Sequence, residues 1–137
     1  MKHTFIAILL VILCNSCDFS EGGVKTGPNM EKYALEYNAK NNLLEPGEKM
    51  LAYYDCTISL DGTEAAFVTN SRVVYHKQET QTTAFYLKDI VDIAHSREDY
   101  VGHLIEVTNT EGEIMMIEIA PLNQGELFLK VLRSKVK

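Results

Sequence analysis

Residues 50–77 read MLAYYDCTISLDGTEAAFVTNSRVVYHK, and this stretch decides the fold. Along residues 50–60 apolar and polar side chains alternate, which is the period of a strand that buries one face. The turn pairs DG (61–62) and NS (70–71) follow, with β-branched and aromatic residues between and after them. The stretch therefore predicts three consecutive antiparallel strands, at residues 50–60, 64–69 and 72–77.

Downstream, the strand pattern returns four times before the chain becomes helical. Pro121 ends the last strand because proline has no N–H to donate to a ladder, and Asn123 can cap a helix. The four predicted strands cover residues 80–87, 89–94, 102–108 and 113–119. The apolar stripe of the helix consists of Leu127, Phe128, Val131 and Leu132. Seven short strands and one amphipathic helix predict a mainly β domain, a bent sheet or barrel capped by its C-terminal helix.

Three motifs in this region resemble a known family. Residues 44–56 (LEPGEKMLAYYDC) resemble the lead-in to the first strand of bacterial domains of the pleckstrin-homology (PH) type. Residues 67–75 (FVTNSRVVY) resemble the second hairpin of that family, and residues 87–93 (LKDIVDI) resemble the segment leading into its fifth strand. The resemblance implies a PH-like domain over residues 44–137, with seven antiparallel strands in two near-orthogonal sheets and a helix over one open end.

The charge of the first predicted hairpin bears on the ligand. PH domains that bind phosphoinositides resemble one another in basic residues there, whereas residues 57–64 (TISLDGTE) contain two acids and no base. Phosphoinositide binding is therefore not expected, and the resemblance implies a non-catalytic module for a protein or peptide partner. A scaffold without an assigned ligand is the other implication, because a shared fold does not fix an activity.

The opening stretch, MKHTFIAILLVILCNSC, is typical of an export signal. Its apolar run at residues 5–13 is too short to span a bilayer but matches the core of a secretory signal peptide. Ser16 and Cys17 resemble the end of a bacterial lipoprotein signal, in which the cysteine is acylated and becomes the N-terminus; Asn15 departs from that pattern. We therefore predict a signal peptide at residues 1–16 and a lipid on Cys17. Cleavage by the ordinary signal peptidase, without a lipid, is the alternative.

The predicted lipid places the protein in the bacterial cell envelope, anchored to a membrane. Asp18 resembles the residue that keeps enterobacterial lipoproteins in the inner membrane, but other lineages do not follow that rule, so inner versus outer membrane stays open. Because Cys14 leaves with the signal, acylation of Cys17 would make Cys56 the one free thiol of the exported chain. Without a lipid, a Cys17–Cys56 disulfide or a dimer is the alternative.

Two segments separate the signal from the strands. Residues 17–28 contain three glycines and a proline, which predict a flexible tether. Residues 29–43 favour a helix with one apolar face. That face consists of Met30, Tyr33, Ala34 and Tyr37. We expect it to pack on the domain; a partner-binding or membrane-lying helix is the alternative.

The composition allows one folded domain. Hydrophobic residues make up 46% of the 137 residues and charged residues 23%, which is ordinary for a chain with a packed core. The formal net charge is -6, and such a charge repels phosphate backbones and anionic headgroups at long range. Nucleic-acid partners are therefore not expected.

Few side chains suggest chemistry. His76, His95 and His103 lack the spacing of a zinc motif, so packing is expected of them, and no metal site or cofactor is predicted. Cys56 falls on the apolar face of its predicted strand, which favours a core position over a nucleophile. The paired carboxylates Glu98-Asp99 and Asp89/Asp92 are typical of solvated loops, so no catalytic residue is predicted.

Two tyrosines are candidate interface residues. Tyr53 falls on the polar face of the first predicted strand, and Tyr100 lies beside a charged loop. Exposed aromatic side chains are favoured at protein interfaces. These features predict a membrane-anchored lipoprotein that carries a non-catalytic PH-like module for a protein or peptide. The alternative is an envelope inhibitor or structural lipoprotein built on another small β-barrel.

Overall fold

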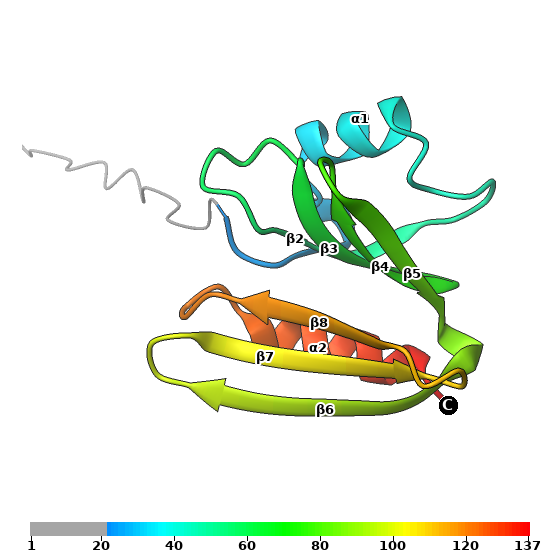
Figure 1. Cartoon of the computed structure of the whole chain (residues 1–137). Helices are drawn as coiled ribbons and strands as arrows, with labels where there is room; N and C mark the ends of the chain where they lie inside the picture. The colour runs from blue at the N-terminus through cyan, green and yellow to red at the C-terminus, as the bar shows by residue number, and fades with distance from the viewer. Residues whose placement is uncertain (1–21) are drawn as a thin grey trace, which may run out of the picture.

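The computed structural model describes residues 22–137, which form two antiparallel sheets and two α-helices (Figure 1). The first sheet has the order β1 (Lys25–Thr26), β2 (Met50–Asp55), β3 (Glu64–Thr69), β4 (Arg72–Lys77), β5 (Gln81–Tyr86). The second sheet has the order β6 (Ile90–Glu98), β7 (Gly102–Asn109), β8 (Ile114–Ile119). The helices are α1 (Lys32–Lys40) and α2 (Gly125–Lys135), with short 3₁₀ turns η1 (Gly27–Asn29) and η2 (Leu87–Asp89). The predicted signal peptide (1–16) and the lipid on Cys17 lie outside the described residues.

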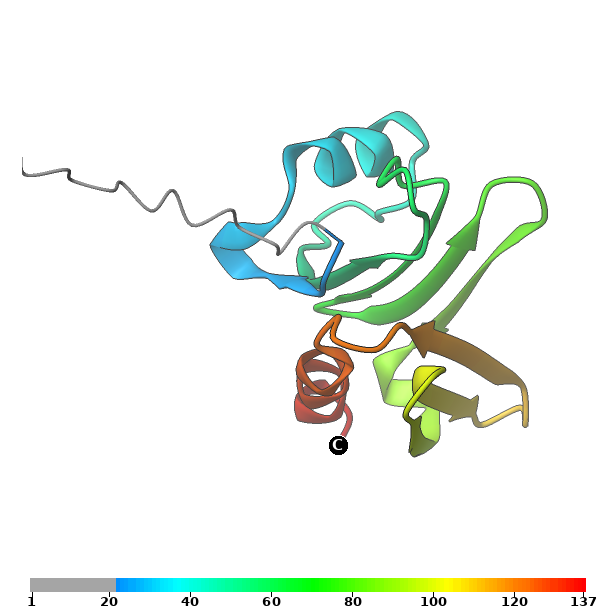
Figure 2. The ribbon, with the colours of Figure 1, turned by 90° about the vertical axis from the view of Figure 1, so that its left-hand side faces the viewer.

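The main core lies between the two sheets and α2, which covers one side of the gap between them (Figure 2). Alternate residues of β7 and β8 point into this core, as the period of two predicts. The largest fully buried contributors from these strands and the helix are Ile105, Val107, Ile117, Ile119, Phe128 and Leu132. The two-sheet form with a C-terminal helix is thus confirmed. The closed-barrel form is wrong, because the described strands form two separate sheets.

A second core cluster lies on the other face of the first sheet, beneath α1. Tyr53 and Phe67 form it together with Ala34 of the helix. The Tyr53 ring stacks on Phe67 with 6.3 Å between ring centroids and meets the edge of Tyr33 at 6.5 Å. Packing of the N-terminal helix on the domain is therefore confirmed. Its predicted span, residues 29–43, is too long, because η1 precedes it and the chain leaves the helix after Lys40.

The burial of Tyr53 corrects the candidate interface. Tyr53 is 1% exposed, so it does not lie on a solvent-facing strand surface. The alternation in β2 indicated one buried face and one wet face, but α1 covers the second face, so the four residues at the end of this strand are all buried. A pattern within one strand carries no information about a helix that packs over it from elsewhere in the chain.

The connection between β2 and β3 also differs from the prediction. The first strand ends at Asp55 rather than continuing to residue 60, and Ile58 is fully exposed. The Asp55 carboxylate accepts hydrogen bonds from the backbone N–H of Thr57 (2.8 Å) and of Gly62 (2.9 Å). Such side-chain acceptors compete with a strand ladder. They fold residues 56–63 into a wide loop in place of the predicted tight hairpin.

Part of the tether predicted at residues 17–28 is packed into the domain, whereas residues 17–21 lie outside the described residues. Val24 is 5% exposed, and its N–H donates to the Asn123 carbonyl at 3.0 Å. β1 then pairs with β2 in the register Lys25↔Tyr53 and Thr26↔Ala52. The second half of the tether is therefore part of the domain, and the glycines there serve turns rather than flexibility.

One ion pair joins two of the motifs that resemble PH domains. Glu48, from the PGE turn before β2, receives hydrogen bonds from Arg72 at the start of β4, with donor–acceptor distances of 2.8 and 2.6 Å. Thr69 and Ser71 donate to the same carboxylate, each at 2.7 Å. Burial alone would raise the pKa of Glu48, but the hydrogen bonds to its carboxylate lower that pKa to about 2. The pair ties the lead-in to the hairpin between β3 and β4.

Candidate functional site

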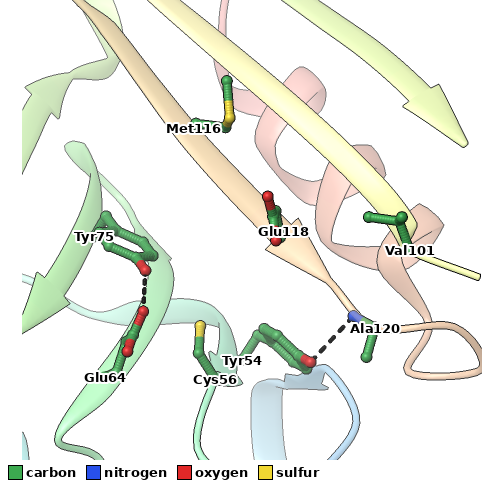
Figure 3. A pocket seen from close by; sticks show the side chains of 8 residues that line it. All are labelled: Tyr54, Cys56, Glu64, Tyr75, Val101, Met116, Glu118 and Ala120. Atoms are coloured by element: carbon green, nitrogen blue, oxygen red, sulfur yellow. Dashed lines mark hydrogen bonds between the residues drawn. The ribbon is translucent and has the colours of Figure 1, made fainter.

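A groove with a volume of about 430 Å³ lies between the two sheets (Figure 3). One wall comes from the first sheet and the following loop, and contains Tyr54, Cys56, Glu64 and Tyr75. The other wall comes from β8 and its surroundings, and contains Val101, Met116, Glu118 and Ala120. Met116 and Glu118 alternate with the buried residues of β8, so the groove lies on the face of that strand away from α2.

The first wall holds an acid that already has partners. Tyr75 donates its hydroxyl hydrogen to the Glu64 carboxylate, and Lys77 Nζ lies 3.2 Å from Glu64 Oε2. The hydrogen bond from Tyr75, followed by Lys77, lowers the pKa of Glu64 despite its partial burial. Burial and the bond to Glu64 raise the pKa of Tyr75, so this hydroxyl stays protonated. Glu64 is therefore a fixed negative charge at neutral pH.

Cys56 lies beside this acid and carries a neutral thiol. Burial, then the charges of Glu64 and Asp55, raise the pKa of Cys56 to about 12. A thiol in this state is a weak nucleophile and a weak metal ligand, because both roles need the thiolate. Cys56 is a half-buried free cysteine that packs against the main core, but it lies in the loop after β2 and lines the groove, rather than occupying the core of the predicted strand.

The second wall offers binding groups without partners. Within residues 22–137, the side chain of Glu118 forms no hydrogen bond or ion pair, and it is exposed. The adjacent Met116 is 49% exposed. Among the described strands, β8 pairs with β7 alone, so its other edge is unpaired there, and β8 lines the groove with Met116 and Glu118. An unpaired strand edge presents backbone N–H and C=O groups to any chain that lies along it.

The groove suits an extended peptide that carries a basic side chain. Two carboxylates lie on opposite walls, and Met116, Val101 and Tyr54 supply apolar contact area. Among the described residues, no cluster of three or more histidines, cysteines and acids could hold a metal ion. In the same part of the chain, no helix is long and apolar enough to cross a bilayer. The groove therefore has the features of a binding site, with no set of groups for acid–base or metal chemistry.

The other residues singled out by sequence lie elsewhere. Tyr100 is 97% exposed in the β6–β7 turn, outside the groove. His76 bonds Tyr37 and Thr82, at 3.0 and 2.8 Å. His103 lines the inner face of β7 with Ile105 and Val107, and its ring bonds that of His95 at 2.9 Å. All three histidines thus have packing or hydrogen-bonding partners.

Sequence reasoning missed Met116 and Glu118. The sequence predicts a strand at residues 113–119 but does not assign its faces, and in the structure both side chains lie on the exposed face of β8. Their place in a groove depends on the approach of β8 to Glu64 and Tyr75, which are far away in the chain. No pattern within one strand reports that approach.

Comparison with known proteins addresses the whole domain. The family model described as "Bacterial PH domain" matches residues 44–133, which run from the lead-in to β2 to the last turn of α2. No curated protein and no solved structure matches the chain. The matched range includes both walls of the groove and excludes β1 and α1, which this chain adds to the domain. Since the match spans well over half of the residues, the chain belongs to the bacterial PH domain family.

Proposed function

We propose that this protein is a membrane-anchored lipoprotein whose PH domain binds an extended, basic segment of a protein partner in the groove beside β8. The observation that carries the proposal is that one wall of the groove combines two features: within residues 22–137, the edge of β8 has no strand partner and the Glu118 carboxylate has no hydrogen bond or ion pair. The module is non-catalytic, because its groove contains a neutral thiol and a tied carboxylate rather than an activated nucleophile.

The binding mode follows from the geometry of the groove. A peptide that adds to the edge of β8 gains main-chain hydrogen bonds, and every second side chain then points toward one face. A lysine or arginine at such a position meets Glu118 on one wall and Glu64 on the other. The net charge of -6 also favours encounter with a basic partner, most strongly at low ionic strength.

The anchor rests on the sequence of the first residues. The apolar run at 5–13 and the small residues before Cys17 favour export and acylation of that thiol. Phosphoinositide headgroups are poor candidates for the ligand, because the β2–β3 loop contains Asp61 and no lysine or arginine. A basic protein segment presented at the membrane surface fits the acidic groove better.

Photo-crosslinking in intact cells tests the groove. A photoreactive side chain at position 116 lies in the groove, whereas one at position 114 lies on the same face of the same strand outside it. We expect a discrete protein adduct from position 116, absent from position 114. The charge-reversing substitution Glu118→Lys should remove the adduct. Equal adducts at both positions, or an adduct that persists with Glu118→Lys, would contradict the proposed site.

A further inference from the structure

Three large apolar side chains are almost fully exposed on three separate loops. Ile58 lies in the β2–β3 loop, Tyr100 in the β6–β7 turn and Leu122 in the β8–α2 connection. Their exposed fractions are 104%, 97% and 96%, the largest of any large hydrophobic side chain among residues 22–137. Val101, the neighbour of Tyr100 in the sequence, is also 46% exposed. Packing within the domain gives no reason for apolar residues at these tips.

Contacts link the three loops to one end of the domain, through the first described residues, 22–24. The β6–β7 turn meets the β8–α2 connection at Gly102, where an added Cβ would lie 2.7 Å from Pro121 N. The β8–α2 connection meets the first described residues through the hydrogen bond from Val24 N–H to the Asn123 carbonyl. The β2–β3 loop meets the same segment at Gly22, where a Cβ would lie 3.6 Å from Leu60 Cδ2. The three tips therefore share the end of the domain that contains Gly22, on the left in Figure 1.

This end is tied to the proposed anchor by a short piece of chain. Five peptide units separate Cys17 from Gly22. Even fully extended, they span at most about 18 Å. If Cys17 carries a lipid in the bilayer, the Gly22 end of the domain is held within that distance of the membrane surface.

We infer that the Gly22 end is a membrane-contacting surface, in which Ile58, Tyr100 and Leu122 enter the interfacial layer of the bilayer beside the lipid on Cys17. The inference rests on the proposed lipidation and goes beyond it, because it fixes the orientation of the domain. Tyrosine suits this depth, since its ring is apolar and its hydroxyl stays in the wet headgroup layer. Tyr100 then contacts lipid rather than a protein partner.

The charges at the Gly22 end favour insertion of apolar side chains into the bilayer over electrostatic attraction to anionic headgroups. The loops of the Gly22 end carry Asp61, Glu98 and Asp99 beside Arg97. The lysines Lys88, Lys135 and Lys137 gather at the opposite end, where the β3–β4 turn meets the end of α2. Anionic lipid should therefore not be needed for the contact. With the Gly22 end on the membrane, the lysine-rich end faces away from it.

Spin-label accessibility on the full-length lipidated protein tests the orientation. The protein carries Cys56→Ala and one nitroxide-labelled cysteine, at position 58, 100 or 122. Matched controls are labels at positions 91 and 114, whose native side chains are 61% and 60% exposed at the other end of the second sheet. The ladder rows at Ile119 and Ile114 are about 17 Å apart. Each variant is placed in vesicles of pure phosphatidylcholine, with and without phosphatidylglycerol.

We expect labels at 58, 100 and 122 to be shielded several-fold from a water-soluble nickel complex and enriched in collisions with oxygen, in both lipid mixtures. Labels at 91 and 114 should stay accessible to nickel. Ile58→Ser with Leu122→Ser should restore nickel access at position 100, whereas Val91→Ser with Ile114→Ser should not.

The outcomes separate the two proposals. Vesicle-bound protein with equal nickel access at all five positions would overturn the orientation and leave the anchor standing. Shielding that appears only in native membranes, and not in protein-free vesicles, would overturn the lipid contact and assign these tips to a protein. A full-length protein that washes off the vesicles would overturn the anchor itself, and the inference with it.

Discussion

The two sheets of this domain differ in how they are covered. The first sheet packs on the main core with one face and beneath α1 with the other, so five of the six residues of β3 are buried. The second sheet has α2 on one face, while its outer face, with Met116 and Glu118, is open. The first sheet is therefore buried on both faces, whereas the second sheet has an open outer face that forms one wall of the groove. Stability and binding can thus be changed separately.

The largest contrast is expected from a pair of truncations, one in each sheet. Phe67→Ala removes a fully buried ring between α1 and the sheet, and should lower the free energy of unfolding by about 3–5 kcal/mol. Met116→Ala removes a side chain that is 49% exposed, and should change it by about 0.5 kcal/mol or less. Urea denaturation followed by circular dichroism measures both. Similar losses in the two variants would contradict the division between the sheets.

The Glu48–Arg72 pair gives the next largest effect. Their side chains are 3% and 12% exposed, and Arg72→Met would leave the Glu48 carboxylate without its cation. Breaking such a pair typically costs about 3 kcal/mol. Arg97→Met is the control, because its ion pair with Glu126 joins side chains that are 63% and 72% exposed. That substitution should cost little, since exposed pairs contribute at most about 1 kcal/mol.

The same pair predicts a pH dependence on the acid side. The pKa of Glu48 falls from 4.5 to about 2 on folding, so the stabilisation is fully present above about pH 4.5. It is lost as the pH falls from that value toward 2, because the unfolded chain then binds the proton more readily. Thermal unfolding of Glu48→Gln should show a shallower acid slope than the wild-type protein. Parallel slopes would exclude Glu48 as a source of acid sensitivity.

A smaller effect is expected from the histidine pair in the second sheet. His103 is 6% exposed, and burial, followed by the charges of His95 and Arg97, lowers its pKa below 6.5. Its neutral form is thus favoured by folding, and stability should fall as the pH drops below 6.5. His103→Gln should flatten the unfolding free energy between pH 7 and 5. An unchanged slope would show that His103 takes up its proton in the folded protein without cost.

Prediction from the sequence succeeds better for the second sheet, which is covered on one face, than for the first sheet, which is covered on both. In β7 and β8 one face is wet, and the strands predicted at residues 102–108 and 113–119 are close to the observed ones. In β2 the period of two placed Tyr53 in solvent, because alternation within a strand cannot register the helix that covers it. The family motifs correctly indicated a PH-like domain, whereas the contact between Glu48 and Arg72 appears only in the structure.

The groove and the exposed loop tips required tertiary structure. Glu64 and Glu118 face one groove only because the two sheets converge there. Similarly, the alternation in residues 50–60 placed Ile58 in a strand, but in the structure the hydrogen bond from Thr57 N–H to Asp55 folds this backbone into a loop and leaves Ile58 exposed. Contacts between residues of different elements produce no hydrophobic periodicity in the sequence. Local hydrogen-bond acceptors such as Asp55 can also end a strand although the alternation of side chains continues.

The anchor is the claim on which the cellular role of both regions depends. Intact-mass spectrometry of the protein extracted from bacterial membranes tests it most directly, with Cys17→Ser as the control. The account predicts a chain that begins at Cys17 and carries the added mass of acyl groups, and a Cys17→Ser protein that lacks this mass. A mature protein that retains Met1, or that begins at an unmodified Cys17, would contradict it.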